Sequence, residues 1–233
     1  MLRKFNVLKN TLGGLVAGLL FVLPVSSAIA DSDQQQLVDK AKITVDALKN
    51  QSEMEQFRKL LAVSKGVVVF PQVLKAGFII GGAGGTGVLL GRNAEGSWSS
   101  PAFYSMGQAS IGLQIGAEAK ELVLVIMTDK GLDAIIKNKV KLGGDLSAAV
   151  GPLGKNVGVS STTNMDVDIF SFAKTAGLFI GASVEGSILD AKDDWQQAYY
   201  GKQVTARNVV VLRSVDNAKS DALKDALKEA EAP

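Results

Sequence analysis

One six-residue glycine pattern occurs three times in this chain and limits the folds that it can adopt. The pattern is glycine, an apolar residue, any residue, isoleucine, glycine and a small residue, and its copies are Gly77–Gly82, Gly112–Ala117 and Gly177–Ala182. In an extended strand, the second and fourth residues of each copy would lie on one face and the two outer glycines on the other. Glycine weakens the interior of a strand, so these paired glycines predict close backbone approach, bending or a barrel-like corner.

Two missing residue types exclude much of the chemistry that enzymes use. The chain has 233 residues, enough for one domain with a sizeable core, but no histidine and no cysteine. It therefore lacks imidazole bases, thiolate nucleophiles, disulfides and the usual ligands of zinc, haem-thiolate and iron–sulfur sites. We expect no catalytic residue, no metal site and no cofactor, although two carboxylates remote in the sequence could still meet in the fold.

The first thirty residues have the features of an export signal. Arg3, Lys4 and Lys9 precede the uncharged apolar stretch Leu12–Val25, and Ala28-Ile29-Ala30 offers a cleavage site. We therefore expect cleavage after Ala30 and a periplasmic or secreted protein. An uncleaved membrane anchor is the alternative, but the apolar stretch is shorter than the ~20 residues that a spanning helix needs.

Removal of this segment changes the net charge. The whole chain has 25 basic and 23 acidic residues, and three of the basic but none of the acidic residues lie in the first thirty, which leaves 22 against 23, or −1. The basic balance thus belongs to the leader, and we expect no nucleic-acid partner.

The order of the predicted elements indicates an α+β fold. We expect Gly-rich antiparallel sheets, with a barrel-like closure as one arrangement, together with N-terminal helices, a short internal helix and a C-terminal helix. The predicted organisation is a signal peptide at 1–30, a helical segment at 31–65, a β-rich core at 66–215 and a charged helix at 216–233.

Individual segments give more specific expectations. Two helices are predicted within residues 32–62, the second beginning at a capping box over Ser52–Glu55, and another helix follows Asp129. Strands are expected at 66–71, ended by Pro71, at 76–92 as one long strand or a bent pair, and at 97–104, 108–117, 121–128, 166–172, 177–189 and 209–212. Helices are expected at 191–200, stopped by Gly201, and at 217–231.

Three short motifs suggest chemistry that their context does not support. Gly82–Gly87 matches the dinucleotide fingerprint G-x-G-x-x-G, but the residues after it predict a strand rather than the helix that would hold a pyrophosphate. Ser171–Lys174 matches S-x-x-K, but its two polar residues would face opposite sides of a strand. Asn164, Asp166 and Asp168 alternate and could offer oxygens to Ca²⁺, yet a solvated strand face is the simpler interpretation.

Six segments, in order and at matching spacing, carry a family resemblance. They are Lys65–Pro71, Lys75–Gly82, Gly87–Arg92, Gly96–Pro101, Ser110–Gly116 and Gly177–Gly186. Over roughly residues 35–215 the chain resembles the SYLF domain family, a lipid-binding module found beside Src-homology and FYVE domains in eukaryotes and alone in exported bacterial proteins.

The resemblance implies binding to phosphoinositides or other acidic phospholipids, and actin bundling is described for fungal members. Actin would not be available to an exported protein, so the expected partner is a phospholipid or membrane surface. Eukaryotic members are similar in using a basic amphipathic N-terminal segment for membrane contact. Here residues 31–65 contain six acidic and six basic residues, which departs from that mode.

Four residues within or beside these motifs are the candidate lipid contacts: Lys65, Lys75, Arg92 and Trp98. The three cations flank predicted strand ends, where they could meet headgroup phosphates, the arginine in a bidentate manner. Trp98 could lie at a membrane interface with its ring in lipid and its N–H in water. The alternatives are a solvated surface charge for each cation and core packing for the tryptophan.

Three functions follow as hypotheses. The first is an exported, non-catalytic phospholipid-binding protein. The second is a structural or protein-interaction module of the envelope without a lipid ligand, in which the terminal helices form the contact surfaces. The third is a hydrolase that uses carboxylates or a Ser–Lys pair, and it has the least support because His and Cys are absent.

Overall fold

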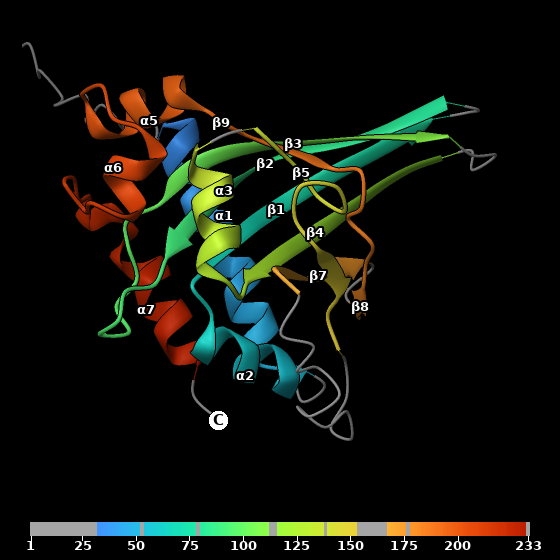
Figure 1. The fold of residues 1–233 in the computed structure, drawn as a ribbon, viewed down its shortest axis with the longest axis horizontal. Coiled ribbons are helices and arrows are strands. Elements are labelled where there is room, and N and C mark those ends of the chain that lie inside the picture. The colour runs from blue at the N-terminus through green and yellow to red at the C-terminus, as the bar shows by residue number, and fades with distance from the viewer. Residues whose placement is uncertain are drawn as a thin grey trace, which may run out of the picture. The chain divides into compact units, whose positions relative to one another are not determined.

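The apolar runs of this sequence form the strands of one large sheet. The structure is a computed structural model that describes residues 32–51, 54–77, 80–111, 116–137, 139–152, 167–175 and 178–231. Its strands are β1 (Gly66–Gly77), β2 (Ile80–Gly91), β3 (Ala102–Ile111), β4 (Gly116–Ile126), β5 (Val140–Lys141), β6 (Ala148–Val150), β7 (Ile169–Thr175), β8 (Leu178–Gly181) and β9 (Ile188–Ala191). The strand order is β5-β9-β3-β2-β1-β4-β7-β6, with β8 also paired to β7, and only the β6–β7 pair is parallel. The sheet is open and curled, which confirms an α+β fold in the form of a half-barrel (Figure 1).

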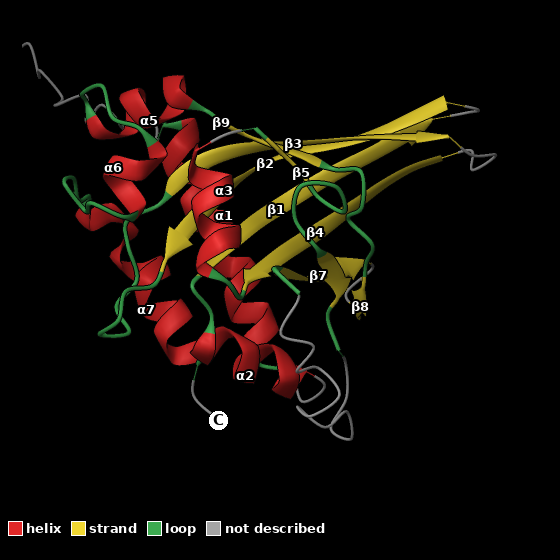
Figure 2. Ribbon diagram, in the orientation of Figure 1, coloured by secondary structure: helices red, strands yellow, loops and turns green. Residues whose placement is uncertain are grey.

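Helices cover both faces of the sheet (Figure 2). They are α1 (Asp33–Lys49), α2 (Glu55–Val63), α3 (Asp129–Lys137), α5 (Asp193–Tyr200), α6 (Ala206–Val210) and α7 (Asp221–Ala230), the last preceded by the 3₁₀ turn Ala218–Ser220. Val67 and Val69 of β1 pack in a cluster with α1, α2 and α7, whereas Val68 and Phe70 pack in a second cluster with α3 and α6. Because both faces are buried there, the helix-covered parts of the central strands, at 67–70, 88–90 and 122–126, are apolar at consecutive rather than alternate positions.

The three glycine hexads lie at or beside the ends of strands. Gly77 ends β1 and Ile80 begins β2, Ile111 ends β3 and Gly116 begins β4, and the third hexad contains β8, which pairs with β7. β1 and β2 are neighbours in the sheet, whereas β2 and β1 lie between β3 and β4. The prediction of one strand over 108–117 was therefore wrong, because a chain reversal falls inside this alternating segment. Residues 78–79, 112–115 and 176–177 lie outside the described residues. The ends of β1 to β4 that carry the first two connections extend beyond the helices (Figure 1).

The sequence predicted that the first strand ends at Pro71, but the strand continues past this residue. β1 continues to Gly77, and its register shifts between Val69 and Gln72 toward β2 and between Phe70 and Val73 toward β4. A bulge at this position accommodates a proline, which has no N–H to donate to a ladder. On the facing strand a Cβ at Gly85 would lie 2.3 Å from the Gln72 carbonyl oxygen. A close backbone approach thus occurs beside the bulge, at a glycine outside the three hexads.

Two other expectations differ from the structure. The apolar segment 209–212 was predicted as a strand, but Val209 and Val210 belong to helix α6, whose capping box is formed by Thr205 and Asn208. A short apolar run has the same pattern in a buried helix turn as in a strand, and here the cap determines the outcome. The single strand predicted at 177–189 is instead two, β8 and β9, separated by a turn.

Several helix predictions are confirmed. α5 ends at Gly201, which has φ +67° and whose N–H bonds the Gln197 carbonyl. α7 buries Leu223 and Leu227. α2 begins after Met54, and Ser52 and Glu53 of the predicted capping box lie outside the described residues.

Candidate functional site

A cleft of about 470 Å³ lies between helix α1 and the part of the sheet where β1 bulges. Its lining comes from α1 (Lys40, Ile43, Thr44), β1 (Pro71, Gln72), β4 (Ala119, Lys120, Glu121) and β7 (Lys174). This volume falls in the range of small-molecule sites in proteins. The bulge matters for the shape of the cleft, because Pro71 and Gln72 are the residues that the register shift displaces.

Helix α1 supplies one wall of the cleft through its amphipathic pattern. Val38, Ala41, Val45 and Leu48 are buried against the sheet and α7. Lys40, Ile43 and Thr44 have the i, i+3, i+4 spacing that places side chains next to one another on a helix. They form a flank of α1 that turns to the cleft, and Ile43 remains 65% exposed there.

The cleft contains more positively than negatively charged side chains. Lys174 Nζ lies 3.0 Å from Glu121 Oε1, an ion pair fixed by the register that places these two residues opposite each other. Lys40 forms no ion pair with any residue in the described part of the chain. Lys120 lies between Ala119 and Glu121 on β4, so alternation places its Cβ on the other face of the strand. On the strand face that Glu121 and Lys174 share, the cleft carries the ammonium groups of Lys40 and Lys174 against one carboxylate, and Lys120 adds a third lysine to the lining.

One carboxylate oxygen in the cleft wall lacks a hydrogen bond. Glu121 Oε1 accepts from Lys174, but Glu121 Oε2 is buried and has no hydrogen-bond partner among the described residues. Buried polar atoms are nearly always hydrogen-bonded, so an exception calls for an explanation such as a missing ligand or water.

An apolar rim adjoins these charges. Leu74 is 55% exposed and stands opposite Gly84 of β2 and Ala119 of β4, the latter in the cleft lining. Leu74 and Gln72 are two residues apart on β1, so they share a face of the sheet. Ile43 and Leu74 thus give the cleft two large exposed apolar side chains beside its lysines, a combination typical of surfaces that contact membranes.

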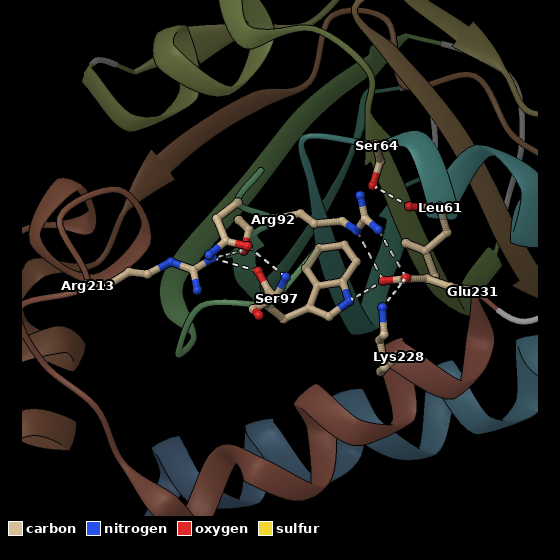
Figure 3. A network of polar contacts seen from close by, with 10 residues as sticks. Leu61, Ser64, Arg92, Ser97, Arg213, Lys228 and Glu231 are labelled. Atoms are coloured by element: carbon tan, nitrogen blue, oxygen red, sulfur yellow. Dashed lines mark hydrogen bonds and ion pairs between the residues drawn. The ribbon is translucent and has the colours of Figure 1, made fainter. Parts of the chain in front are cut away.

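Two of the four predicted lipid contacts lie together, around a carboxylate from the end of the chain. Glu231 accepts from Arg92 Nε at 3.2 Å and from Arg92 Nη2 at 3.3 Å (Figure 3). Glu231 Oε1 also accepts from Trp98 Nε1 at 2.7 Å, and Lys228 Nζ lies 3.1 Å from Oε2. Trp98 is 6% exposed and packs in the core cluster with α1 and α7. Both the guanidinium fork and the indole N–H therefore already have a protein partner.

The other two predicted contacts lie far from each other. Lys65 precedes β1 and pairs with Asp129, the first residue of α3, at 3.1 Å. Lys75 lies near the outer end of β1, opposite Glu118 of β4. Ten residues of strand separate the two lysines by about 30 Å, so one ligand headgroup could not contact both.

The structure shows the surroundings of two of the three short motifs that suggested chemistry. Gly82–Gly87 lies wholly inside β2, and no helix begins there to hold a pyrophosphate, which excludes the dinucleotide interpretation. The Ser171 hydroxyl lies within hydrogen-bond distance of two carbonyl acceptors, those of Ala182 and Ala149, while Lys174 pairs with Glu121. The prediction that Ser171 and Lys174 are not a catalytic pair agrees with these separate partners.

The sequence predicted a solvated strand face for Asp168, but the structure buries this residue. It is 3% exposed and accepts from Thr128 Oγ1 at 2.6 Å, from Ser147 N and Oγ at 3.1 and 3.0 Å, and pairs with Lys130. Burial opposes ionisation of Asp168, but these donors outweigh it and hold its pKa below the usual value. Asp168 therefore fastens the start of α3 to β7, and Asn164 and Asp166 lie outside the described residues.

The described residues contain neither a cluster of metal-ligating side chains nor a membrane-spanning helix. They contain no group of three or more acidic side chains arranged to hold a metal ion. Over the same residues, no helix combines the length and apolarity needed to cross a bilayer.

Sequence reasoning missed most of the cleft. Lys40, Glu121 and Lys174 come from α1, β4 and β7, and no local pattern links them. The one available signal was Lys174 itself, which the S-x-x-K match singled out for a different chemistry. The exposed apolar Ile43 could have been noticed as a break in the polar flank of the first helix.

A family profile and several known proteins are similar to this chain. A family profile described as "Ysc84: Las17-binding protein actin regulator" matches residues 107–230. The chain is 31% identical over 169 residues to SH3 domain-containing YSC84-like protein 1 of Bos taurus, covering 72% of this chain and 49% of the relative. It is 34% identical over 167 residues to SH3 domain-containing protein PJ696.02 of Schizosaccharomyces pombe, covering 70% and 39%.

A third relative has a partner in its name. LAS seventeen-binding protein 3 of Saccharomyces cerevisiae is 30% identical over 154 residues, covering 65% of this chain and 33% of the relative. The chain thus spans between a third and a half of the length of these relatives. The profile and the Saccharomyces cerevisiae relative are named for binding or regulation, and none of these names describes an enzyme.

Proposed function

Because this chain belongs to the SYLF family, the family of the Ysc84 profile, we propose that it is an exported phospholipid-binding protein without catalytic activity. The observation that carries the proposal is the cleft between α1 and the sheet, in which Lys40 and Lys174 lie with exposed Ile43. Exposed Leu74 adjoins it, opposite the lining residue Ala119. A phospholipid presents the same two chemistries next to each other, an anionic phosphate and an apolar chain.

Simple electrostatics describes how the cleft would work. Lys40 and Lys174 provide two ammonium groups for a headgroup phosphate, and Ile43 and Leu74 would enter the acyl region beside it. Attraction between exposed lysines and a charged surface is screened within about 10 Å at 0.1 M salt. Binding through this cleft should therefore weaken as salt is raised, while the apolar contribution persists.

Vesicle binding tests the proposal directly. We expect the purified protein to co-sediment with phosphatidylcholine vesicles that contain an anionic phospholipid, and the double variant Lys40→Gln/Lys174→Gln to bind about tenfold more weakly. The matched control is Lys59→Gln/Lys137→Gln, which removes two exposed lysines outside the cleft and should bind as the unmodified protein does. Equal binding by both double variants would refute the cleft as the lipid site.

The lipid role predicted for Lys65, Lys75, Arg92 and Trp98 is tested in the same assay. If a Lys65→Ala/Lys75→Ala/Arg92→Ala variant binds vesicles normally, these three cations are not lipid contacts. A large loss would transfer the lipid site to them. Trp98→Phe keeps the ring packing but removes the N–H donor, so a loss of vesicle binding by this variant would implicate the indole.

Export is a separate part of the proposal. The basic, apolar and Ala-x-Ala segments of residues 1–30 support it. Mass spectrometry of the protein from an envelope fraction should give a chain that begins at Asp31. A full-length mass would favour the uncleaved anchor.

A protein-interaction module is the second candidate, and one observation favours it. β9 pairs with residues 104–107 of β3, and β7 pairs with residues 121–126 of β4, so the outer ends of both strands lack a further strand neighbour among the described residues. Open edges of this kind can accept a strand from a partner. A stable protein complex that excludes lipid, including one with actin or its regulators as the names of the relatives suggest, would favour this candidate.

A further inference from the structure

The lysine cleft contains a carboxylate that a site for simple phosphate would not need. Glu121 lines the cleft and holds Lys174 at 3.0 Å from Oε1, while its Oε2 has no hydrogen-bond partner in the described part of the chain. The two side chains are 26% and 21% exposed. Ion pairs that are partly open to water contribute little net stability, so Lys174 can exchange Glu121 for a ligand when that ligand also gives Glu121 a donor.

That exchange has a consequence for the ligand. When Lys174 turns to a phosphate, Glu121 loses the only donor shown for it, and a carboxylate in a partly buried wall is left without compensation. The terminal torsion of a glutamate is broad, so either oxygen of Glu121 can face the cleft. A hydroxyl or ammonium group on the ligand, next to its phosphate, would replace the lost donor.

The charge balance limits the phosphate as well. The lining contains three lysines, Lys40, Lys120 and Lys174, and one carboxylate, so Glu121 is the group in it that repels a phosphate. A phosphomonoester approaches two negative charges near neutral pH and would be repelled by Glu121. A carboxylate inside a cationic site thus discriminates through repulsion as well as through attraction.

We propose that the cleft selects a phosphodiester headgroup that carries its own hydrogen-bond donor, with Lys40 and Lys174 on the phosphate and Glu121 on the hydroxyl or ammonium. The proposal rests on the phospholipid-binding function put forward above and specifies its headgroup. Glycerol and ethanolamine headgroups belong to this class, whereas choline has no donor and phosphatidic acid is a monoester.

A matched pair of lipids separates the donor from the charge. Phosphatidylglycerol and phosphatidylmethanol are both phosphodiesters with one negative charge, but only the first has headgroup hydroxyls. In phosphatidylcholine vesicles with equal fractions of either lipid, we expect the protein to bind the phosphatidylglycerol vesicles about fivefold more tightly. Phosphatidic acid at the same fraction should bind more weakly than phosphatidylglycerol despite its higher charge.

Two variants test the part assigned to Glu121. Glu121→Gln removes the carboxylate charge and should raise binding to phosphatidylmethanol and phosphatidic acid, so that the preference for phosphatidylglycerol falls toward one. Glu121→Ala removes the acceptor entirely and should give the same loss of preference. Urea unfolding of both variants establishes that they remain folded, and Lys59→Gln provides a folded control with the preference unchanged.

The outcomes are distinguishable. Tight binding to both lipids with a ratio near one, or a preference that survives Glu121→Ala, overturns this inference but leaves phospholipid binding in place. Calorimetry with soluble glycerophosphoglycerol separates a lipid headgroup from a free phosphodiester, because binding of the soluble compound without vesicle binding would keep the headgroup chemistry and refute the membrane function. The absence of binding in both arms would overturn both proposals.

Discussion

Two clusters in this protein combine cations with a carboxylate, and they differ in how completely the carboxylate is satisfied. Around Glu231, Arg92, Trp98 and Lys228 supply donors to both oxygens, and the Glu231 side chain is 8% exposed. In the cleft, the described residues offer Glu121 one donor, from Lys174, and Lys40 lies nearby without an ion pair.

The comparison separates a structural role from a binding role. At Glu231 the hydrogen bonds join the hairpin after β2 to the end of α7, so the cluster holds two distant parts of the chain together (Figure 3). At Glu121 the pair joins neighbouring strands that a ladder already connects, so its loss costs the fold little. The sequence suggested Arg92 and Trp98 as lipid contacts, but the cleft with Lys40 and Lys174 is the better candidate for a ligand site.

The largest expected effect comes from the satisfied cluster. Glu231→Ala leaves the Arg92 fork and the Trp98 N–H without their acceptor, and we expect it to lower the free energy of unfolding by about 2–4 kcal/mol. Urea unfolding measures the change. Lys228→Gln, which removes the exposed member, should cost no more than about 0.5 kcal/mol. Normal stability of Glu231→Ala would break the comparison.

The next effect concerns the bulge that shapes the cleft. A Cβ on Gly85 would lie 2.3 Å from the Gln72 carbonyl oxygen, and Gln72 lines the cleft. Gly85→Ala should therefore destabilise the protein by about 2–3 kcal/mol and weaken vesicle binding of the folded fraction. Gly107→Ala is the matched control, because its Cβ meets nothing within 4 Å, and it should change stability by less than about 1 kcal/mol. Similar results for both glycines would contradict the close approach.

A third carboxylate, Asp168, extends the comparison to pH. Its folded pKa lies below the ordinary value of 3.8, so its contribution to stability is present above that pH and is lost as the pH falls through the folded pKa. At pH 7 we expect Asp168→Asn to cost about 1–2 kcal/mol. Unfolding measured at pH 7, 5 and 3 should show the two proteins converging only at the lowest pH. A difference that does not change with pH would mean that the charge of Asp168 is unimportant.

The smallest stability effect is expected in the cleft. Glu121→Gln breaks a partly exposed ion pair and should change the free energy of unfolding by less than about 1 kcal/mol, while it alters lipid preference as described above. Together with Glu231→Ala it forms a crossed test, in which one variant changes stability alone and the other changes binding alone. A strongly destabilised Glu121→Gln would place both carboxylates in the same structural class.

Much of the fold could be predicted because burial on both faces leaves a strong pattern. Leu122 to Ile126 is continuously apolar and forms the part of β4 that lies between β1 and β7, as a central strand should. The stop at Gly201 and the stripe of Leu223 and Leu227 likewise depend on local chemistry. Two of the predictions that failed, at Pro71 and at 209–212, fell where a neighbouring strand or a cap decided between two conformations that the local pattern permits equally.

By itself, the sequence determined the strand-forming runs, the helix that ends at Gly201, the family and the absence of histidine and cysteine chemistry. Only the tertiary structure decided that Glu121 meets Lys174, that Arg92 and Trp98 meet Glu231, and that α1 closes a cleft over the bulge. The physical reason is that periodicity encodes which face of an element is buried, whereas the register of β4 on β7 and the packing of α1 and α7 determine which residues become neighbours.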